Sequence, residues 1–412
     1  MKPINVGLLG IGTVGGGTYT VLTRNQEEIA RRAGRPIAIT RVADRNLELA
    51  RQVTGGKIDV TDDAFAIVSD PAIDIVVELI GGYTVARELV LKAIENGKHV
   101  VTANKALIAC MAMKFLPLRR KKASSSLLKL PLLVVSPLFK AVREGLAANR
   151  IEWIAGIING TTNFILSEMR EKGLAFADVL KEAQRLGYAE ADPTFDVEGI
   201  DAAHKLMILA AMLWLFVHSL CRGITKLDAV DITKRTDKGV ELRVHPTLIP
   251  EKRLICQCEW RNECCAGQGR CCWPTLYYGA GAGAEPTASA VADLVDGTDR
   301  GISCPHLAFQ PDRLVDLPIL PIGEISSAYY LRLRAVDKPG VLADVTRILG
   351  DRQISIDAMI QKEPQEGEDQ ADIIILTHVT VEKNMDDAIA AIEALPAISG
   401  KVTRLRMEEL SR

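Results

Sequence analysis

A glycine-rich turn near the amino terminus constrains the fold of this chain more than any other feature. It lies between a short apolar run at 5–9 and a segment of helical spacing at 14–32. In such a strand–turn–helix unit, one glycine makes the tight turn, one exposes backbone to a pyrophosphate, and one lets the two elements pack closely. The turn predicts a dinucleotide-binding site. The expected cofactor-binding residues are Gly10, Gly12, Thr13, Val14 and Gly15.

Three further apolar segments in the first third of the chain predict strands. They span 37–44, 73–80 and 99–104, and the second is rich in the β-branched residues that suit a strand buried on both faces. Helical signals alternate with these strands, and that alternation is typical of a parallel sheet with crossover helices. The predicted fold class is therefore α/β, beginning with a Rossmann-type domain.

The residues that follow the second strand bear on the choice of cofactor. Asp44 offers a carboxylate that can accept hydrogen bonds from ribose hydroxyls, and Arg45 offers a guanidinium that can pair with a 2′-phosphate. Both residue types are present. We expect NADP as the cofactor, with NAD as the alternative.

Charge and hydropathy argue against several partners. Fifty basic and fifty-two acidic residues leave a net charge of −2, so no overall field attracts nucleic acid. The first residues lack the pattern of a secretory signal, which predicts a cytoplasmic protein. The longest apolar run, 206–217, is shorter than the roughly 18 to 20 residues that cross a bilayer and predicts a buried helix.

A pair of opposite charges marks the middle of the chain. Asp201 and Lys205 are four residues apart on a helix expected to begin near Val197, so their side chains leave the same face. A solvated ion pair would explain this spacing by itself. However, the helix is otherwise strongly apolar, and acidic residues crowd the loop before it. Such a setting suits a substrate that carries an ammonium group, together with a proton donor. The acidic residues of the loop are Glu190, Asp192 and Asp196.

Seven segments spread over most of the chain together resemble the bacterial type of homoserine dehydrogenase. They are "GIGTVGGG", "VVELIGG", "GKHVVTANKALIA", "INGTTNFIL", "GYAEADPTFDVEGIDAAHKLMIL", "HPTLIP" and "YYGAGAGAEPTASAV". The resemblance implies a reversible reduction of L-aspartate 4-semialdehyde to L-homoserine with NAD(P)H, a step toward threonine and methionine. It also implies a substrate and dimerisation domain of the α+β type.

The resemblance implies a role for three polar residues. Lys205 would protonate the carbonyl oxygen as hydride arrives, while Glu190 and Asp201 would hold the amino group and hydroxyl of the substrate. A positioned general acid contributes about 10²- to 10⁴-fold to a rate, and a lysine can also act as a fixed cation. Lys205 as an ordinary surface residue is the alternative.

The resemblance also extends the cofactor site. Lys105, at the carboxyl edge of the sheet, would contact the cofactor and the substrate, with a merely structural lysine as the alternative. Gly187 would contact the cofactor, and Gly283 would close over its nicotinamide end. His204 would point about 100° away from Lys205 around the helix, which favours packing over catalysis.

We expect three domains. Residues 1–135 form the NAD(P)-binding domain, 136–308 the catalytic and dimerisation domain, and 328–412 a small βαββαβ domain, joined by a proline-containing linker at 309–327. The turn at 338–342 resembles that of the ACT domain. The resemblance implies a threonine effector and a homo-oligomer, and a domain used only for dimerisation is the alternative.

Six of the nine cysteines lie between 253 and 273. Their spacing does not match a zinc ribbon, and disulfides conflict with a reducing compartment. A third hypothesis is a one-base slip in the reading frame of the gene, because such a slip can convert 256–274, 110–137 and 212–222 into sequence similar to the family. Resequencing of the coding DNA tests it. The nine cysteines, all in segments that depart from the family, are Cys110, Cys221, Cys256, Cys258, Cys264, Cys265, Cys271, Cys272 and Cys304.

The departure at 110–137 affects a cation site of the family. There a glutamate and backbone carbonyls around 129–136 would bind a monovalent cation, but Lys129 occupies the glutamate position and Pro131 follows. We therefore predict no metal ligand. Two functional classes stay open, an active dehydrogenase and a catalytically impaired relative that binds only nucleotide or amino acid.

Overall fold

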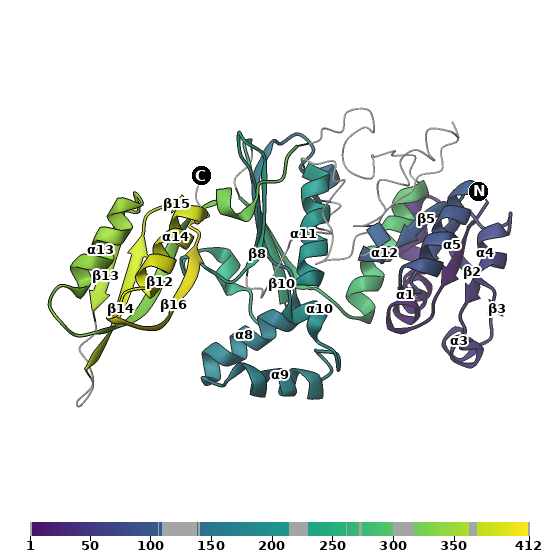
Figure 1. Cartoon of the computed structure of the whole chain (residues 1–412). Coiled ribbons are helices and arrows are strands. Elements are labelled where there is room, and N and C mark those ends of the chain that lie inside the picture. Colours follow the sequence, from purple (N-terminus) through teal and green to yellow (C-terminus); the bar gives the residue numbers. More distant parts are fainter. Residues whose placement is uncertain are drawn as a thin grey trace.

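The computed structural model describes residues 2–105, 107–108, 138, 141–213, 230–260, 262–271, 274–299, 317–361 and 369–410. Figure 1 shows three parts in a row, with the amino-terminal part at the right and the carboxyl-terminal part at the left. Among the described residues, no helix combines the length and the apolar character that crossing a membrane requires.

The first part is a parallel sheet with strand order β3-β2-β1-β4-β5. Its strands are β1 Ile4–Leu9, β2 Ile37–Ala43, β3 Asp59–Thr61, β4 Ile75–Glu78 and β5 His99–Thr102. Its helices are α1 Thr13–Arg24, α2 Gln26–Ala33, α3 Leu47–Thr54, α4 Ala64–Ser69 and α5 Thr84–Glu95. The predicted Rossmann-type sheet is confirmed. Because the strands are parallel, all their carboxyl ends meet at one edge, where the glycine turn lies.

The helical segment expected at 14–32 is two helices. α1 ends at Arg24 and α2 begins at Gln26, with Asn25 between them in a non-helical conformation. Asparagine competes with the helical backbone for hydrogen bonds, so it favours helix ends over helix interiors.

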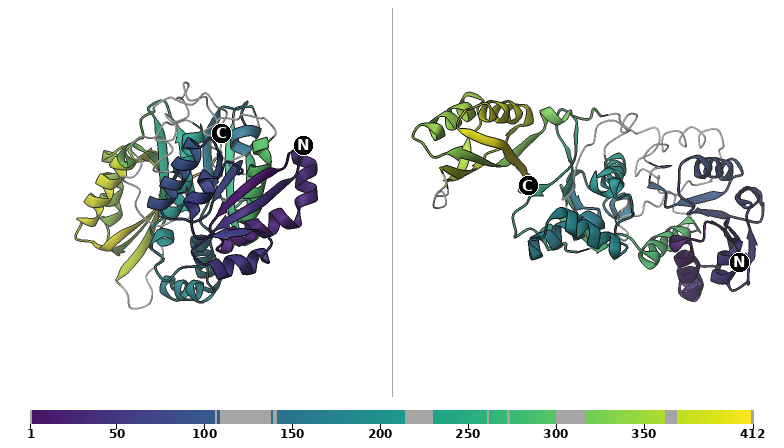
Figure 2. Two further views of the ribbon diagram at one scale, coloured as in Figure 1. Left: turned by 90° about the vertical axis from the view of Figure 1, so that its right-hand side faces the viewer. Right: turned by 60° about the horizontal axis from the view of Figure 1, so that its bottom comes forward.

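A helix from late in the chain completes the first part. α12 (Ala284–Asp299) packs against α1, and its buried residues Ala288, Val291 and Val295 share a core with the first sheet. Figure 2 shows this helix beside the amino-terminal part in both further views. α12 lies within 136–308, the range expected for the second domain, but its apolar face belongs to the first domain.

The second part is an antiparallel sheet with strand order β11-β10-β6-β7-β8. Its strands are β6 Ile151–Ile157, β7 Val230–Arg235, β8 Val240–His245, β10 Asn262–Gly269 and β11 Thr275–Ala280. Its helical segments are η1 Ala141–Gly145, α8 Gly160–Lys172, α9 Phe176–Arg185, α10 Thr194–Val197, α11 Ile200–Leu213 and η2 Leu254–Gln257.

The buried helix predicted from the apolar run is α11. It begins at Ile200 rather than near Val197, because Gly199 has a left-handed backbone, with φ of +70°, that interrupts the helix after α10. Asp201 therefore lies in the first turn of α11, where the helix dipole favours a negative charge. Ten residues of this helix are buried, including Lys205.

The third part has the βαββαβ order that the sequence predicts. Its elements are η3 Ile322–Glu324, β12 Ser326–Val336, α13 Val341–Asp351, β13 Ile356–Gln361, β14 Gln370–Thr377, β15 Thr380–Val381, α14 Glu382–Glu393 and β16 Ile398–Met407. The sheet order is β13-β14-β12-β16-β9, and the last strand, β9 (Thr247–Leu248), comes from the second part of the chain. The two parts are therefore joined by strand pairing as well as by the covalent linker.

Candidate active site

The glycine turn has the geometry that its sequence predicts. Gly10 has φ of +93°, and a Cβ atom there would lie 2.8 Å from the main-chain oxygen of Leu79. A Cβ on Gly15 would lie 2.0 Å from the main-chain oxygen of Gly10. Only glycine fits at either position. Gly12 has open space around it, and α1 starts at Thr13 without a side-chain cap. The first N–H groups of α1 are thus suited to a phosphate.

The carboxylate of Asp44 lies against this turn. Its Oδ2 atom accepts a hydrogen bond of 2.7 Å from the backbone N–H of Ile11, and its Oδ1 atom accepts one of 2.8 Å from Asn46. Arg45, the residue expected to pair with a 2′-phosphate, is exposed at the same edge of the sheet.

A cavity of about 320 Å³ lies where the first and second parts meet. It is lined by Val14, Leu79, Gly81, Ala103, Asn104, Lys105, Phe195, Asp201 and His204. The lining combines the carboxyl edge of the parallel sheet with the first turns of α11. In open α/β sheets, ligands bind in the crevice at this edge.

Glu78 shapes one wall of the cavity and was not predicted from the sequence. It is fully buried at the end of β4, and its Oε1 atom accepts hydrogen bonds from the backbone of Ile80 and Gly81. Thr102 donates to its other oxygen. Burial raises the pKa of Glu78, an effect that these three hydrogen bonds oppose. Its carboxyl group therefore fixes the loop that forms the wall.

Lys205 and Asp201 meet beside the cavity as their spacing predicts. Lys205 is only 3% exposed, and its Nζ atom lies 3.0 Å from Oδ2 of Asp201. Lys105 donates a hydrogen bond to the other oxygen, Oδ1. One carboxylate therefore holds both lysines.

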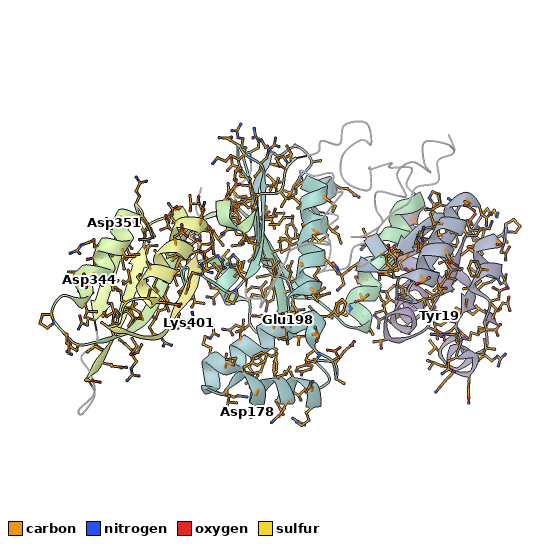
Figure 3. All side chains as sticks on the ribbon, in the orientation of Figure 1. Tyr19, Asp178, Glu198, Asp344, Asp351 and Lys401 are labelled. Carbon is orange, nitrogen blue, oxygen red and sulfur yellow. The ribbon has the colours of Figure 1, made fainter. Side chains whose placement is uncertain are left out.

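Figure 3 shows the side chains of the two parts that carry the site. It labels Glu198, just before α11, in the middle part, and Tyr19 on α1 in the first part.

A second carboxylate contacts Lys205, and sequence reasoning missed it. The Nζ atom donates 2.8 Å to Oε1 of Glu263 on β10, and it also donates to the main-chain oxygen of Ile158. Glu263 is 2% exposed. With Asp201, these groups give the ammonium an acceptor for each of its three protons. Glu263 lies in the cysteine-rich segment 253–273, for which the sequence predicts no catalytic role.

Burial and charge act against each other on the ionisable groups. Burial alone would lower the pKa of Lys205, but the carboxylates of Glu263 and Asp201 outweigh it and raise that pKa above its usual value. Burial alone would raise the pKa of Asp201, but Lys205 and Lys105 outweigh it and lower that pKa. Burial raises the pKa of Glu263 more than Lys205 lowers it. Lys205 is therefore an ammonium at neutral pH.

His204 lines the cavity although its direction on the helix favoured packing. It is half-buried, and burial lowers its pKa, an effect that Asp201 opposes. The signal in the sequence was its position beside Lys205.

Of the predicted site residues, Val14, Lys105 and Asp201 line the cavity, whereas Glu190, Gly187 and Gly283 are among those that do not. Glu190 is exposed, and its main-chain oxygen accepts a hydrogen bond from Gln184. Gly187 follows α9 with φ of +71°, and Gly283 precedes α12 with φ of +130°. Both glycines occupy positions that disfavour other residues. Their roles stay predictions.

The five described cysteines are free thiols, and all five lie in or near β10. They are Cys256, Cys258, Cys264, Cys265 and Cys271. Cys264 and Cys265 are buried in different apolar clusters on opposite faces of the sheet. In the part of the chain that the structure describes, no group of three potential ligands could hold a metal ion. The reading-frame hypothesis is not tested by this arrangement and stays a prediction.

Several predictions fall outside the described residues. They concern the segment 110–137 with Lys129 and Pro131, the segment 214–222, the linker positions 309–316, and the residues Cys110, Cys221, Cys272 and Cys304.

Three family models match the chain. The model described as "Homoserine dehydrogenase, NAD binding domain" matches residues 10–126, "Homoserine dehydrogenase" matches 137–295, and "ACT domain" matches 329–397.

Curated relatives and a solved structure are similar over the whole chain. The homoserine dehydrogenase of Pseudomonas aeruginosa is 53% identical over 436 positions, and that of Neisseria gonorrhoeae is 51% identical over 435, each covering 100% of both proteins. The crystal structure of a homoserine dehydrogenase from Thiobacillus denitrificans has a TM-score of 0.91 at 55% identity, covering 100% of this chain and 99% of that one.

Proposed function

The chain belongs to the homoserine dehydrogenase family, and from this premise we propose that it interconverts L-aspartate 4-semialdehyde and L-homoserine with NADP or NAD. The reaction would serve the biosynthesis of threonine and methionine, in the cytoplasm. One observation carries the proposal: the buried ammonium of Lys205 is held by Asp201, which lines a cavity at the carboxyl edge of the nucleotide-binding sheet.

Lys205 has the properties of a group that stabilises charge on oxygen. Hydride addition to an aldehyde builds negative charge on the carbonyl oxygen, and an oriented cation in a buried site lowers the energy of that charge. The raised pKa of Lys205 keeps it protonated, so it can donate a hydrogen bond to this oxygen and then a proton. An incoming oxygen would replace one of its three present acceptors.

Asp201 and Lys105 support this role. The Asp201 carboxylate contacts both lysines, so it fixes their separation and lines the cavity from the side of α11. Asp201 would hold the substrate through the hydroxyl of homoserine, because its charge is already paired with the two lysines. Glu190, in the exposed loop before α10, is proposed as the partner of the substrate ammonium group.

The residues at the glycine turn fit a dinucleotide, which supplies or accepts the hydride when bound. Gly10 and Gly15 leave backbone without side chains at the turn, and Asp44 lies beside it. Arg45 would pair with a 2′-phosphate, and we therefore propose NADP as the preferred cofactor.

The carboxyl-terminal ACT domain supports regulation by an amino acid. We propose threonine as the effector, and a homo-oligomer as the assembly. Strand pairing between β9 and β16 joins this domain to the second part, which offers a route by which an effector could influence the catalytic sheet.

Turnover measurements test the proposal. The protein should oxidise NADPH when L-aspartate 4-semialdehyde is added, and homoserine should be identified as the product. Lys205→Ala should lower kcat by about 10²- to 10⁴-fold and leave NADPH affinity unchanged. Cofactor binding without any turnover would instead indicate the impaired relative, an alternative that the similar proteins do not support.

A further inference from the structure

Asn159 lies between the active-site carboxylates, and the proposed chemistry gives it no role. It follows β6, is only 3% exposed, and forms the cap that precedes α8. It belongs to the motif "INGTTNFIL".

The orientation of the Asn159 side chain is determined by its neighbours. Its Oδ1 atom accepts hydrogen bonds of 2.9 Å from both the backbone N–H and the hydroxyl of Thr162. The backbone N–H can only donate, so it requires an oxygen at that place, and the amide nitrogen must point the other way.

The amide nitrogen bridges two carboxylates. Nδ2 lies 2.8 Å from Oδ1 of Asp196 and 3.3 Å from Oδ2 of Asp201. An amide nitrogen carries two protons, so it can serve both acceptors at once. It therefore separates two anions that would otherwise repel each other across this wall of the site.

The consequence for Lys205 is geometric. Oδ1 of Asp201 is held by Lys105, and Oδ2 is shared between Lys205 and Asn159. Donors on both oxygens prevent the carboxylate from rotating about its Cβ–Cγ bond. The position of the Lys205 ammonium depends on this carboxylate, and small displacements of a reacting group cost large factors in rate.

We propose that Asn159 is a positioning residue that orients Asp201 and, through it, Lys205. This inference rests on the proposed function. The competing explanation is that Asn159 serves only as the cap of α8. The two explanations differ in which half of the amide matters, since the oxygen caps the helix and the nitrogen contacts the carboxylates.

Asn159→Ser separates these two halves. Serine is as good a cap as asparagine, because its hydroxyl accepts from the same backbone N–H, but it is too short to reach Asp196 and Asp201. We expect kcat to fall by about 10- to 100-fold, while the melting temperature and the affinity for NADPH stay near those of the native protein.

A comparison of kcat with KM for NADPH gives a readout that a purely structural role would not produce. Loss of Nδ2 should displace Asp201 and, through it, Lys205, while the glycine turn that binds the nucleotide stays intact. We therefore expect kcat to fall and KM for NADPH to stay at its native value. The charged and titratable groups that face Asp201 are Lys205 and His204 on α11, Lys105 after β5, Glu263 on β10 and Asp196 on α10; all of them remain in the variant.

Asn163→Ser is the matched control. Asn163 lies one turn further along α8 and is also buried, but its amide donates to main-chain oxygens of Cys258 and Asn262. We expect this variant to lose stability and to keep the native kcat.

Two results would overturn the inference. One is native kcat in a folded Asn159→Ser protein, which would leave Asn159 with capping alone. Should serine prevent folding, Asn159→Asp keeps the cap and the size while adding a third carboxylate, and undiminished activity there would be equally decisive. If the native protein shows no turnover, the proposed function fails, whereas a native enzyme that tolerates both substitutions contradicts only the role of Asn159.

Discussion

The Nζ atom of Lys205 lies 3.0 Å from Oδ2 of Asp201, one turn earlier on the same face of α11. This contact keeps a positive charge in a buried position, because a lone ammonium there would lose its hydration without compensation. The same carboxylate reaches Lys105 at the edge of the nucleotide-binding sheet. Asp201 thus connects Lys105, in the cofactor-binding part of the molecule, to Lys205, the proposed acid on α11.

Asp201→Asn should impair catalysis more than folding. The substitution keeps the shape but removes the negative charge, so Lys105 loses its partner and Lys205 keeps only one carboxylate. We expect kcat to fall by about 10- to 100-fold while NADPH still binds. Steady-state kinetics and cofactor titration check this, and kcat equal to that of the native enzyme would contradict it.

Glu263→Gln should raise kcat/KM for the aldehyde by about 10-fold. Negative charge develops on the substrate oxygen beside Lys205, and a carboxylate 2.8 Å from that ammonium competes for it. Kinetics at several pH values test the effect. Intact mass must first establish that the protein carries the printed residues 256–274, and a fall in kcat/KM would show that Glu263 supports the reaction instead.

Gly15→Ala should destabilise the nucleotide-binding site. The new Cβ would lie 2.0 Å from the main-chain oxygen of Gly10, so the turn or the helix must move. We expect a loss of about 1 to 3 kcal/mol in unfolding free energy and weaker NADPH binding. Gly16→Ala is the control on the same helix, because its Cβ would make only ordinary contacts at 3.5 Å or more. An equal loss of unfolding free energy and of NADPH affinity in Gly15→Ala and Gly16→Ala would contradict the prediction.

Arg45→Ala should change the cofactor preference. The exposed guanidinium is available to the 2′-phosphate of NADP, a group that NAD lacks. We expect KM for NADPH to rise about 10-fold and KM for NADH to change little. Parallel measurements with both cofactors check the prediction, and an equal rise for both would refute it.

His245 should make stability depend on pH. Burial, with Arg406 and Arg243 nearby, lowers the pKa of His245 to about 3. An unfolded histidine titrates near 6.5, so between about pH 6.5 and 3 the unfolded chain binds the extra proton. The contribution of neutral His245 to the free energy of unfolding is complete above about pH 6.5. It is lost as pH falls toward about 3, by up to about 1.4 kcal/mol per pH unit.

Denaturant unfolding of the native protein and of His245→Gln at pH 7 and pH 5 checks this sign. The variant should lose less unfolding free energy than the native protein between the two pH values. An equal loss in both would mean that His245 does not titrate in this window.

Local patterns in the sequence were sufficient for several of the elements that position the site, although not for β10, which carries Glu263. The glycine turn, the strands after it and the βαββαβ order are set by hydrogen bonding and side-chain periodicity within short segments. The spacing of Asp201 and Lys205 is also local, since both lie on one helix. Helix ends were less predictable, because single residues such as Asn25 and Gly199 decided them.

Contacts between distant segments needed the tertiary structure. Lys105 and Asp201 are 96 positions apart, Asn159 and Asp201 are 42 apart, and Lys205 and Glu263 are 58 apart. No periodicity within a segment encodes such distances, because they depend on how the two sheets and α11 pack. The packing of α12 on the first domain is of the same kind. The sequence alone determined which chemical groups are present and on which elements, whereas the packing of those elements decided which groups share the buried charge of Lys205.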